Sequence, residues 1–211
     1  MAGKLRVIEI FDSLQGEGWW AGVPMSFVRL AGCNAPELGL ECLRWCDTRA
    51  AWDPSAGEVF SISEVLGQVR LPRICVTGGE PLLQKQALNE LIREAHRHGQ
   101  KVHLETNGTL EPPELACDWV VVSPKPPDYF LSPGWEGRVN ELKLIADERL
   151  DASVAEQLAA AYPRAVVCIQ PLSPPHKKTP APHSVERAFA LVRSHPDWRL
   201  SLQIHKLLGL R

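Results

Sequence analysis

Short apolar runs alternate with longer amphipathic stretches along most of this chain. Runs of about four to seven apolar residues are typical of buried strands. The predicted strands are Val7–Phe11, Met25–Ala31, Arg73–Thr77, Lys101–Thr106, Trp119–Ser123, Asn140–Ala146, Ala165–Gln170 and Trp198–Ile204.

Helical periodicity lies between several of these strands. Leu82, Leu83, Ala87, Leu88, Leu91, Ile92 and Ala95 recur at helical spacing, and Gly99 follows where a C-cap is expected. Further helices are predicted over Ser61–Arg70, Pro113–Cys117, Asp151–Ala161 and Val185–Val192.

This alternation predicts an α/β fold with a parallel sheet built from strand–helix–strand units. About six of these strands alternate with helices, which is too few for a closed eight-stranded barrel of ~250 residues. We therefore expect an open partial (β/α) barrel. No repeat or long linker divides the chain, which predicts a single domain over residues 1–211. Functional groups in such sheets gather at the carboxyl ends of strands. Polar motifs follow the apolar runs at Thr77–Glu80, Glu105–Gly108, Ser123–Lys125 and Gln170–Pro171.

Composition narrows the class of protein. The chain is 45% hydrophobic and 23% charged with a net charge of −2, which suits a folded globular protein and gives no electrostatic case for nucleic acid or membrane. No apolar run reaches the ~18 residues of a membrane span, and no apolar signal region follows the start of the chain. We therefore expect a cytoplasmic protein.

The six cysteines fall into two groups. Cys75, Cys117 and Cys168 stand alone within or beside apolar segments, as buried free cysteines often do. Cys33, Cys42 and Cys46 are clustered, with eight and three residues between them. Three thiolates without an evident fourth suit a [4Fe–4S] cluster whose last iron stays open. A zinc site with histidine as the fourth ligand fits the spacing equally well, so the cysteines alone leave both readings open.

Two motifs accompany these cysteines: Trp45 directly precedes Cys46, and Gly78-Gly79-Glu80-Pro81 follows the predicted strand Arg73–Thr77. With these motifs the chain resembles radical S-adenosylmethionine (SAM) enzymes. The resemblance implies a [4Fe–4S] cluster on Cys33, Cys42 and Cys46, with SAM bound to the open iron. The usual family spacing is Cys-x3-Cys-x2-Cys, so the longer intervals here predict an altered cysteine loop.

Further motifs are Glu9–Gly18, Phe27–Cys33, Cys46-Asp47-Thr48, Glu105–Gly108, Ser123–Lys125, Glu141-Leu142-Lys143 and Leu202–Lys206. In these motifs the chain, from Ile8 to the C-terminus, is similar to the 7-carboxy-7-deazaguanine synthases. That family contracts 6-carboxy-5,6,7,8-tetrahydropterin to 7-carboxy-7-deazaguanine with loss of ammonia, in queuosine and deazapurine biosynthesis. A radical formed from SAM takes a hydrogen from the substrate and returns one later. The resemblance also implies Mg²⁺, an electron donor such as flavodoxin, and a homodimer.

The resemblance assigns a role to each motif residue. SAM would be bound by Trp45, Asp47, Gly78, Gly79, Glu80, Ser123, Pro124, Lys125 and Gln170. The pterin would be bound by Leu14, Gln15, Gly16, Arg29, Thr77, His205 and, in a C-terminal segment that closes over the substrate, Arg211. Thr48 would bind Mg²⁺ through its hydroxyl, since this hard cation prefers oxygen ligands.

Two other interpretations remain. An activase of glycyl-radical enzymes would share the cluster and Gly-Gly-Glu-Pro, but would not need Gln15–Gly18 or Cys46-Asp47-Thr48. A non-catalytic zinc-binding protein would explain the cysteines alone. Colour distinguishes the two metals, because anaerobically purified protein is brown with an iron–sulfur cluster and colourless with zinc.

Overall fold

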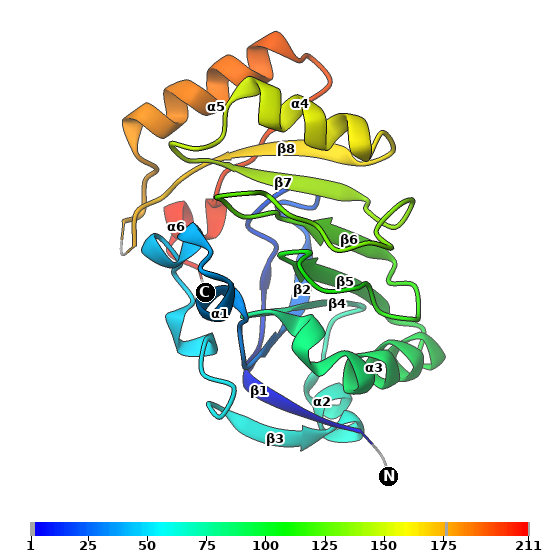
Figure 1. The fold of residues 1–211 in the computed structure, drawn as a ribbon. Helices are drawn as coiled ribbons and strands as arrows, with labels where there is room; N and C mark the ends of the chain where they lie inside the picture. Colours follow the sequence, from blue (N-terminus) through cyan, green and yellow to red (C-terminus); the bar gives the residue numbers. More distant parts are fainter. Residues whose placement is uncertain (1–2, 176, 211) are drawn as a thin grey trace.

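The computed structural model describes residues 3–175 and 177–210, and within them nine strands form one sheet (Figure 1). The strands are β1 (Lys4–Leu14), β2 (Pro24–Leu30), β3 (Glu58–Ser61), β4 (Arg73–Gly78), β5 (Lys101–Thr106), β6 (Trp119–Val122), β7 (Glu141–Ala146), β8 (Val166–Pro171) and β9 (Arg199–Leu200). Their order is β3-β1-β2-β4-β5-β6-β7-β8-β9. From β2 to β9 neighbouring strands are parallel, whereas β1 is antiparallel to both β2 and β3. The edge strands β3 and β9 do not pair with each other, so the sheet is open and the predicted partial barrel is confirmed.

Four helices cover the outer face of the sheet: α2 (Ile62–Gln68), α3 (Lys85–Arg97), α4 (Ala152–Ala161) and α5 (Pro182–Ser194) (Figure 1). Local sequence fixes where they begin. Ser61 and Glu64 form a capping box at α2, and the carboxylate of Asp151 accepts from Val154 N at 2.9 Å to cap α4. These helices lie where the periodicity predicts them.

Shorter helical turns complete the helical structure. They are α1 (Ala35–Leu38), η1 (Glu41–Arg44) and η2 (Arg49–Ala51) in the cysteine segment, η3 (Pro81–Gln84) before α3, and α6 (Ile204–Leu208) near the C-terminus. Helix α6 lies against the cysteine segment, where Lys206 pairs with Asp47, although the two are far apart in sequence. The cysteine segment and the polar motif Leu202–Lys206 therefore meet in space.

Strand β7 shows how the sheet separates core from site. Leu142 and Leu144 are fully buried under the helices, while Lys143 and Ile145 line a cavity on the opposite face. Successive side chains of a strand point to opposite faces, which produces this division. The outer face is thus apolar, and the inner face carries the polar residues.

Three sequence predictions differ from the structure. The predicted helix Pro113–Cys117 is a loop, and the described residues between β6 and β7 hold no helix either. Instead Trp135 fills the outer core there; its indole N–H donates to Gly108 O at 3.1 Å and Leu110 O at 3.0 Å. The predicted strand Trp198–Ile204 is wrong beyond β9, because Gln203 leads into α6. Strand β3 was not predicted.

No helix in the described part of the chain is both long and apolar enough to cross a membrane.

Candidate active site

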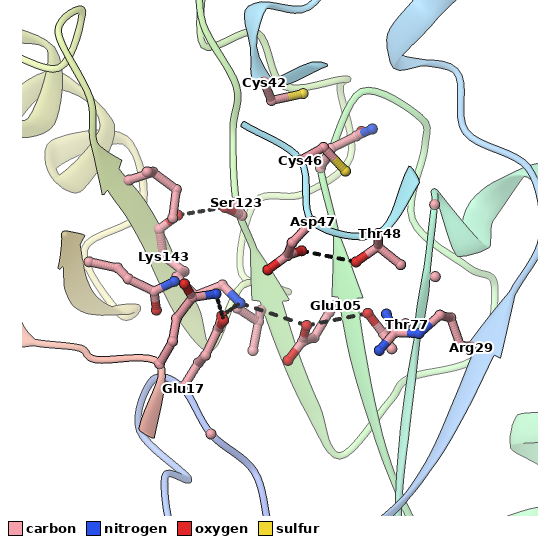
Figure 2. A pocket seen from close by; sticks show the side chains of 18 of the residues that line it. Glu17, Arg29, Cys42, Cys46, Asp47, Thr48, Thr77, Glu105, Ser123 and Lys143 are labelled. Atoms are coloured by element: carbon pink, nitrogen blue, oxygen red, sulfur yellow. Dashed lines mark hydrogen bonds and ion pairs between the residues drawn. The ribbon is translucent and has the colours of Figure 1, made fainter. Parts of the chain in front are cut away.

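A cavity of about 610 Å³ opens on the inner face of the sheet (Figure 2). Its walls are the carboxyl ends of the strands, the cysteine segment and the residues around α6. Most of the residues singled out from the sequence line it: Leu14, Gln15, Gly16, Arg29, Cys33, Cys42, Trp45, Cys46, Asp47, Thr48, Thr77, Gly78, Gly79, Ser123, Lys125, Gln170 and His205. Motifs spread over the chain therefore meet at one place.

Glu80 and Pro124 do not line this cavity, and Arg211 lies outside the described residues. The Glu80 carboxylate is fully buried and accepts from Leu82 N at 3.0 Å, Thr106 Oγ1 at 2.8 Å and Asn107 N at 2.8 Å. Burial raises the pKa of Glu80, and these hydrogen bonds counter that rise. Glu80 thereby ties the residues after β4 to the end of β5, and its expected role toward SAM stays a prediction.

The three clustered cysteines all face the cavity, and the loop that carries them accommodates its unusual spacing by local turns. Gly39 adopts a left-handed conformation (φ 64°) to end α1, which absorbs the long first interval. Cys42 lies inside η1, and Trp45 N donates back to Cys42 O at 3.1 Å. This tight turn brings Cys46 closer to Cys42 along the loop, so Cys46 still faces the cavity.

The thiols of Cys33 and Cys42 are poor nucleophiles without a metal. Burial raises the pKa of Cys33 to about 11 and also raises the pKa of Cys42. Metal binding must therefore release protons from these thiols. In the residues that the structure describes, no three His, Cys, Asp or Glu side chains converge as ligands of a single ion.

Gly79 sets how closely β4 approaches the cysteine loop. A Cβ atom at this position would lie 2.2 Å from Gly32 O, 2.7 Å from Ala51 O and 2.7 Å from Cys33 Cβ. Two of these neighbours are backbone atoms that cannot swing aside. Only glycine allows this approach, which explains the Gly-Gly motif after the strand.

The other cysteines are core residues, as predicted. Cys75 and Cys168 are buried, and Cys117 is half-buried against the main core. Burial raises the pKa of each of the three thiols.

Beside the cysteines lies a second part of the wall, built from the ends of β6 and β7. Lys125 Nζ donates to Ser123 Oγ at 2.6 Å, and Ser123 Oγ donates to Lys143 O at 2.8 Å. Lys125 also lies 5.5 Å from the centre of the Trp45 ring, a cation–π contact. Burial lowers the pKa of Lys125. The predicted SAM residues Trp45, Ser123 and Lys125 thus contact one another.

At the other end of the cavity, two carboxylates share one buried ammonium (Figure 2). Lys143 Nζ donates to Glu17 and lies 3.7 Å from Glu105 Oε2. Gln15 Nε2 donates to Glu105 Oε1 at 3.0 Å, and Thr77 Oγ1 donates to Glu105 Oε2 at 3.4 Å. Burial by itself raises the pKa of Glu17, yet the charge and hydrogen bonds of Lys143 bring it down to about 2. Both members of the Glu17–Lys143 pair are therefore charged at neutral pH.

The residues around α6 close the cavity. Gln203 Nε2 donates to Glu17 Oε1 at 2.7 Å, and Ile204 N donates to Gly16 O at 2.9 Å. Lys206 Nζ contacts Gln203 Oε1 at 2.9 Å and Asp47 Oδ2 at 2.5 Å. Asp47 therefore binds Lys206, and it also accepts from Thr48 Oγ1 at 3.0 Å.

Gly16 fits this closure because a Cβ atom there would lie 1.9 Å from His205 Nδ1. Arg29 lines the cavity and donates from Nε to Glu9 Oε1 at 2.8 Å.

The sequence assignments missed several charged or polar wall residues, among them Glu17, Glu105, Lys143, Gln203 and Lys206. All five belong to motifs quoted from the sequence, but no role followed for them. A stronger signal was available for Lys143, since a charge within the apolar run of β7 must face a cavity or a partner.

Comparisons with known proteins agree with this geometry. A family model described as a 4Fe-4S single cluster domain matches residues 14–112, the span that holds all three clustered cysteines. The chain is thus similar to iron–sulfur proteins. It is 37% identical to the 7-carboxy-7-deazaguanine synthase of Hyperthermus butylicus, over 98% of this chain and 93% of the relative. It is 38% identical to that of Bordetella pertussis, over 97% of this chain and 98% of the relative.

The crystal structure of QueE from Escherichia coli is similar in fold, with a TM-score of 0.76 and 25% identity. The match covers 94% of this chain and 93% of that one. The chain belongs to the 7-carboxy-7-deazaguanine synthase family.

Proposed function

We propose that this protein is a radical SAM lyase that converts 6-carboxy-5,6,7,8-tetrahydropterin to 7-carboxy-7-deazaguanine with loss of ammonia. The observation that carries the proposal is one cavity that joins three cysteines at one end to a Glu17–Lys143–Glu105 cluster at the other. Family membership supports the same activity and disfavours a glycyl-radical activase or a non-catalytic zinc protein.

At the cysteine end, Cys33, Cys42 and Cys46 would hold the [4Fe–4S] cluster. When bound, the cluster supplies the electron that cleaves SAM. Ser123, Lys125 and Trp45 form a connected wall beside the thiols and would orient SAM through charge-assisted contacts. Gly78, Gly79 and Gln170 complete this end, where glycines let a ligand approach the backbone.

At the opposite end, the chain's own charges suit a pterin. Carboxylates accept hydrogen bonds from amide and amine N–H groups, so Glu17 and Glu105 would accept from the pterin ring. Arg29 would bind the substrate carboxylate as a fixed cation. Leu14, Gln15, Gly16, Thr77 and His205 form the surrounding wall, and the α6 segment would keep water out.

Mg²⁺ would bind near Thr48. The hydroxyl of Thr48 already lies 3.0 Å from Asp47 Oδ1, which places two hard oxygens together in the wall. Thr48→Val keeps the shape and removes the oxygen. We expect normal iron content and SAM binding in this variant, with poor turnover that excess Mg²⁺ partly restores. Wild-type turnover at low Mg²⁺ would contradict this assignment.

Four further features stay predictions: a flavodoxin-like electron donor, a homodimer, a cytoplasmic location, and a single domain whose C-terminal segment closes over the substrate.

The direct test is turnover of the carboxy-tetrahydropterin with SAM, Mg²⁺ and dithionite, with the product identified by mass. Cys33→Ala, Cys42→Ala and Cys46→Ala should each abolish reconstituted iron and SAM cleavage. Cys75→Ala, Cys117→Ala and Cys168→Ala are matched controls that should keep their iron, because those thiols belong to the core. A colourless protein that holds zinc, or a brown one that leaves the pterin unchanged, would refute the proposal.

A further inference from the structure

Trp52 is bonded to two of the three clustered cysteines. Its indole Nε1 donates to Cys46 Sγ with a separation of 3.3 Å, and its backbone carbonyl accepts from Cys33 N at 3.2 Å. The ring is half-buried and lines the cavity. No sequence motif had assigned it a role.

The surrounding backbone fixes the position of this indole. The single turn η2 separates Trp52 from Thr48, and Trp52 N donates to Arg49 O at 3.1 Å. The guanidinium of Arg49 lies 5.6 Å from the centre of the Trp52 ring and also donates to Leu43 O at 3.4 Å. The loop from Leu43 to Trp52 therefore closes on itself and aims the indole N–H at Cys46.

An indole N–H only donates hydrogen bonds, and the Cys46 sulfur is its acceptor here. Hydrogen bonds to the ligand sulfurs are one of the factors that set a cluster's reduction potential. Reduction adds one electron to the oxidised cluster, [4Fe–4S]²⁺, and yields [4Fe–4S]⁺ without moving any atom. The added negative charge spreads onto the thiolates, so a donor at Cys46 stabilises the reduced state more than the oxidised one.

We propose that Trp52 raises the reduction potential of the cluster through its hydrogen bond to Cys46. This inference rests on the proposed function, since it concerns the cluster that the three cysteines would hold. It assigns to Trp52 the task of bringing the cluster within reach of a physiological reductant.

The test removes the N–H while keeping the ring. Trp52→Phe deletes the donor, and replacement of Trp52 by 3-benzothienylalanine keeps the bicyclic shape with sulfur in place of N–H. Trp198→Phe is the matched control, because Trp198 stacks on His195 at a ring separation of 3.8 Å and does not line the cavity. Each anaerobically reconstituted protein is analysed for iron per chain and then poised at a series of potentials with dithionite and mediators. The paramagnetic signal of the reduced cluster is recorded at each potential.

We expect both Trp52 replacements to keep their iron and to lower the midpoint potential. The equilibrium constant for reduction should fall about tenfold, or ~59 mV for one electron. Trp198→Phe should leave the midpoint unchanged. An unchanged midpoint in the benzothienyl protein with full iron would overturn the role of Trp52 and leave the proposed function intact. Wild-type protein that forms no [4Fe–4S] cluster would overturn both.

Discussion

Replacing Lys143 by methionine tests the electrostatic core of the cavity. The substitution keeps a long side chain in β7 and removes the ammonium between Glu17 and Glu105. At the 3.7 Å separation from Glu105, the attraction is about 4 kcal/mol at an effective dielectric constant of ~20. Glu17, which is closer, contributes at least as much. The cost of burying the ammonium offsets part of this attraction. Removing one partner of a buried ion pair typically costs about 3–5 kcal/mol. We expect a loss of that size in the free energy of unfolding at pH 8.

The pH dependence of this loss follows from the pKa of Glu17. In the wild type, Lys143 holds that pKa at about 2, below its usual value of 4.5. The contribution of Glu17 to stability is therefore present above the unfolded value and is lost only as the pH falls toward about 2. Lys143 has a raised pKa, so its contribution is lost only in strong alkali. The wild-type pair is thus constant between about pH 5 and 8.

Lys143→Met changes this balance. Without the ammonium, burial raises the pKa of Glu17 above its unfolded value, and protonation then favours the folded state. The loss in the free energy of unfolding relative to the wild type should be largest at pH 8 and should shrink as the pH falls toward about 5. Urea unfolding of metal-free protein, followed by tryptophan fluorescence at both pH values, measures it.

Lys101→Met is the matched control, since its pair with Asp118 at 2.9 Å involves a lysine side chain that is 58% exposed. That pair should contribute less than about 1 kcal/mol. A Lys143→Met deficit no larger than this, or one equal at both pH values, would refute the reasoning.

Three glycine substitutions give further predictions. Gly16→Ala should displace His205, whose Nδ1 lies 1.9 Å from the new Cβ; limited proteolysis should then cut near the C-terminus faster, while iron content stays normal. Gly79→Ala should push Cys33 out of place at a cost of about 1–3 kcal/mol, so reconstituted iron should fall; full iron would contradict the packing argument. Gly67→Ala in α2 meets nothing within 4 Å and should stabilise the protein by up to about 1 kcal/mol in urea unfolding, as alanine favours helix.

Periodicity predicted the parts of the fold that depend on local pattern. The helix from Lys85 to Arg97 and the buried strand from Glu141 to Ala146 have strong periods or apolar runs, and both were found. The loop at Pro113 was mistaken for a helix because proline suits a helix start, whereas Trp135 actually fills that part of the core. When a distant aromatic residue fills the core in place of a helix, the local sequence gives no sign of it.

The site divides in the same way. The cysteines are clustered and the Gly-Gly-Glu-Pro residues are consecutive in sequence, so their neighbourhood could be inferred from motifs. The contacts of Lys143 and Lys206 depend on which strands and helices meet, so their partners could not be derived from spacing. The partners of Glu80 could not be derived from spacing either, because its carboxylate accepts from backbone N–H groups that only the folded strand ends bring together.

The closing contacts around α6 have a consequence for how the protein is made. Ser201 accepts from Gly18 N and Gln203 donates to Glu17 across separations of 183 and 186 residues. Such distant pairings form late, because a long loop must first be closed. On a translating ribosome, strands β1, β2 and β4 and the cysteine loop leave the exit tunnel well before these last partners. During synthesis the thiols therefore face an uncovered sheet, and the wall beside Glu17 is completed only after residue 203 has emerged.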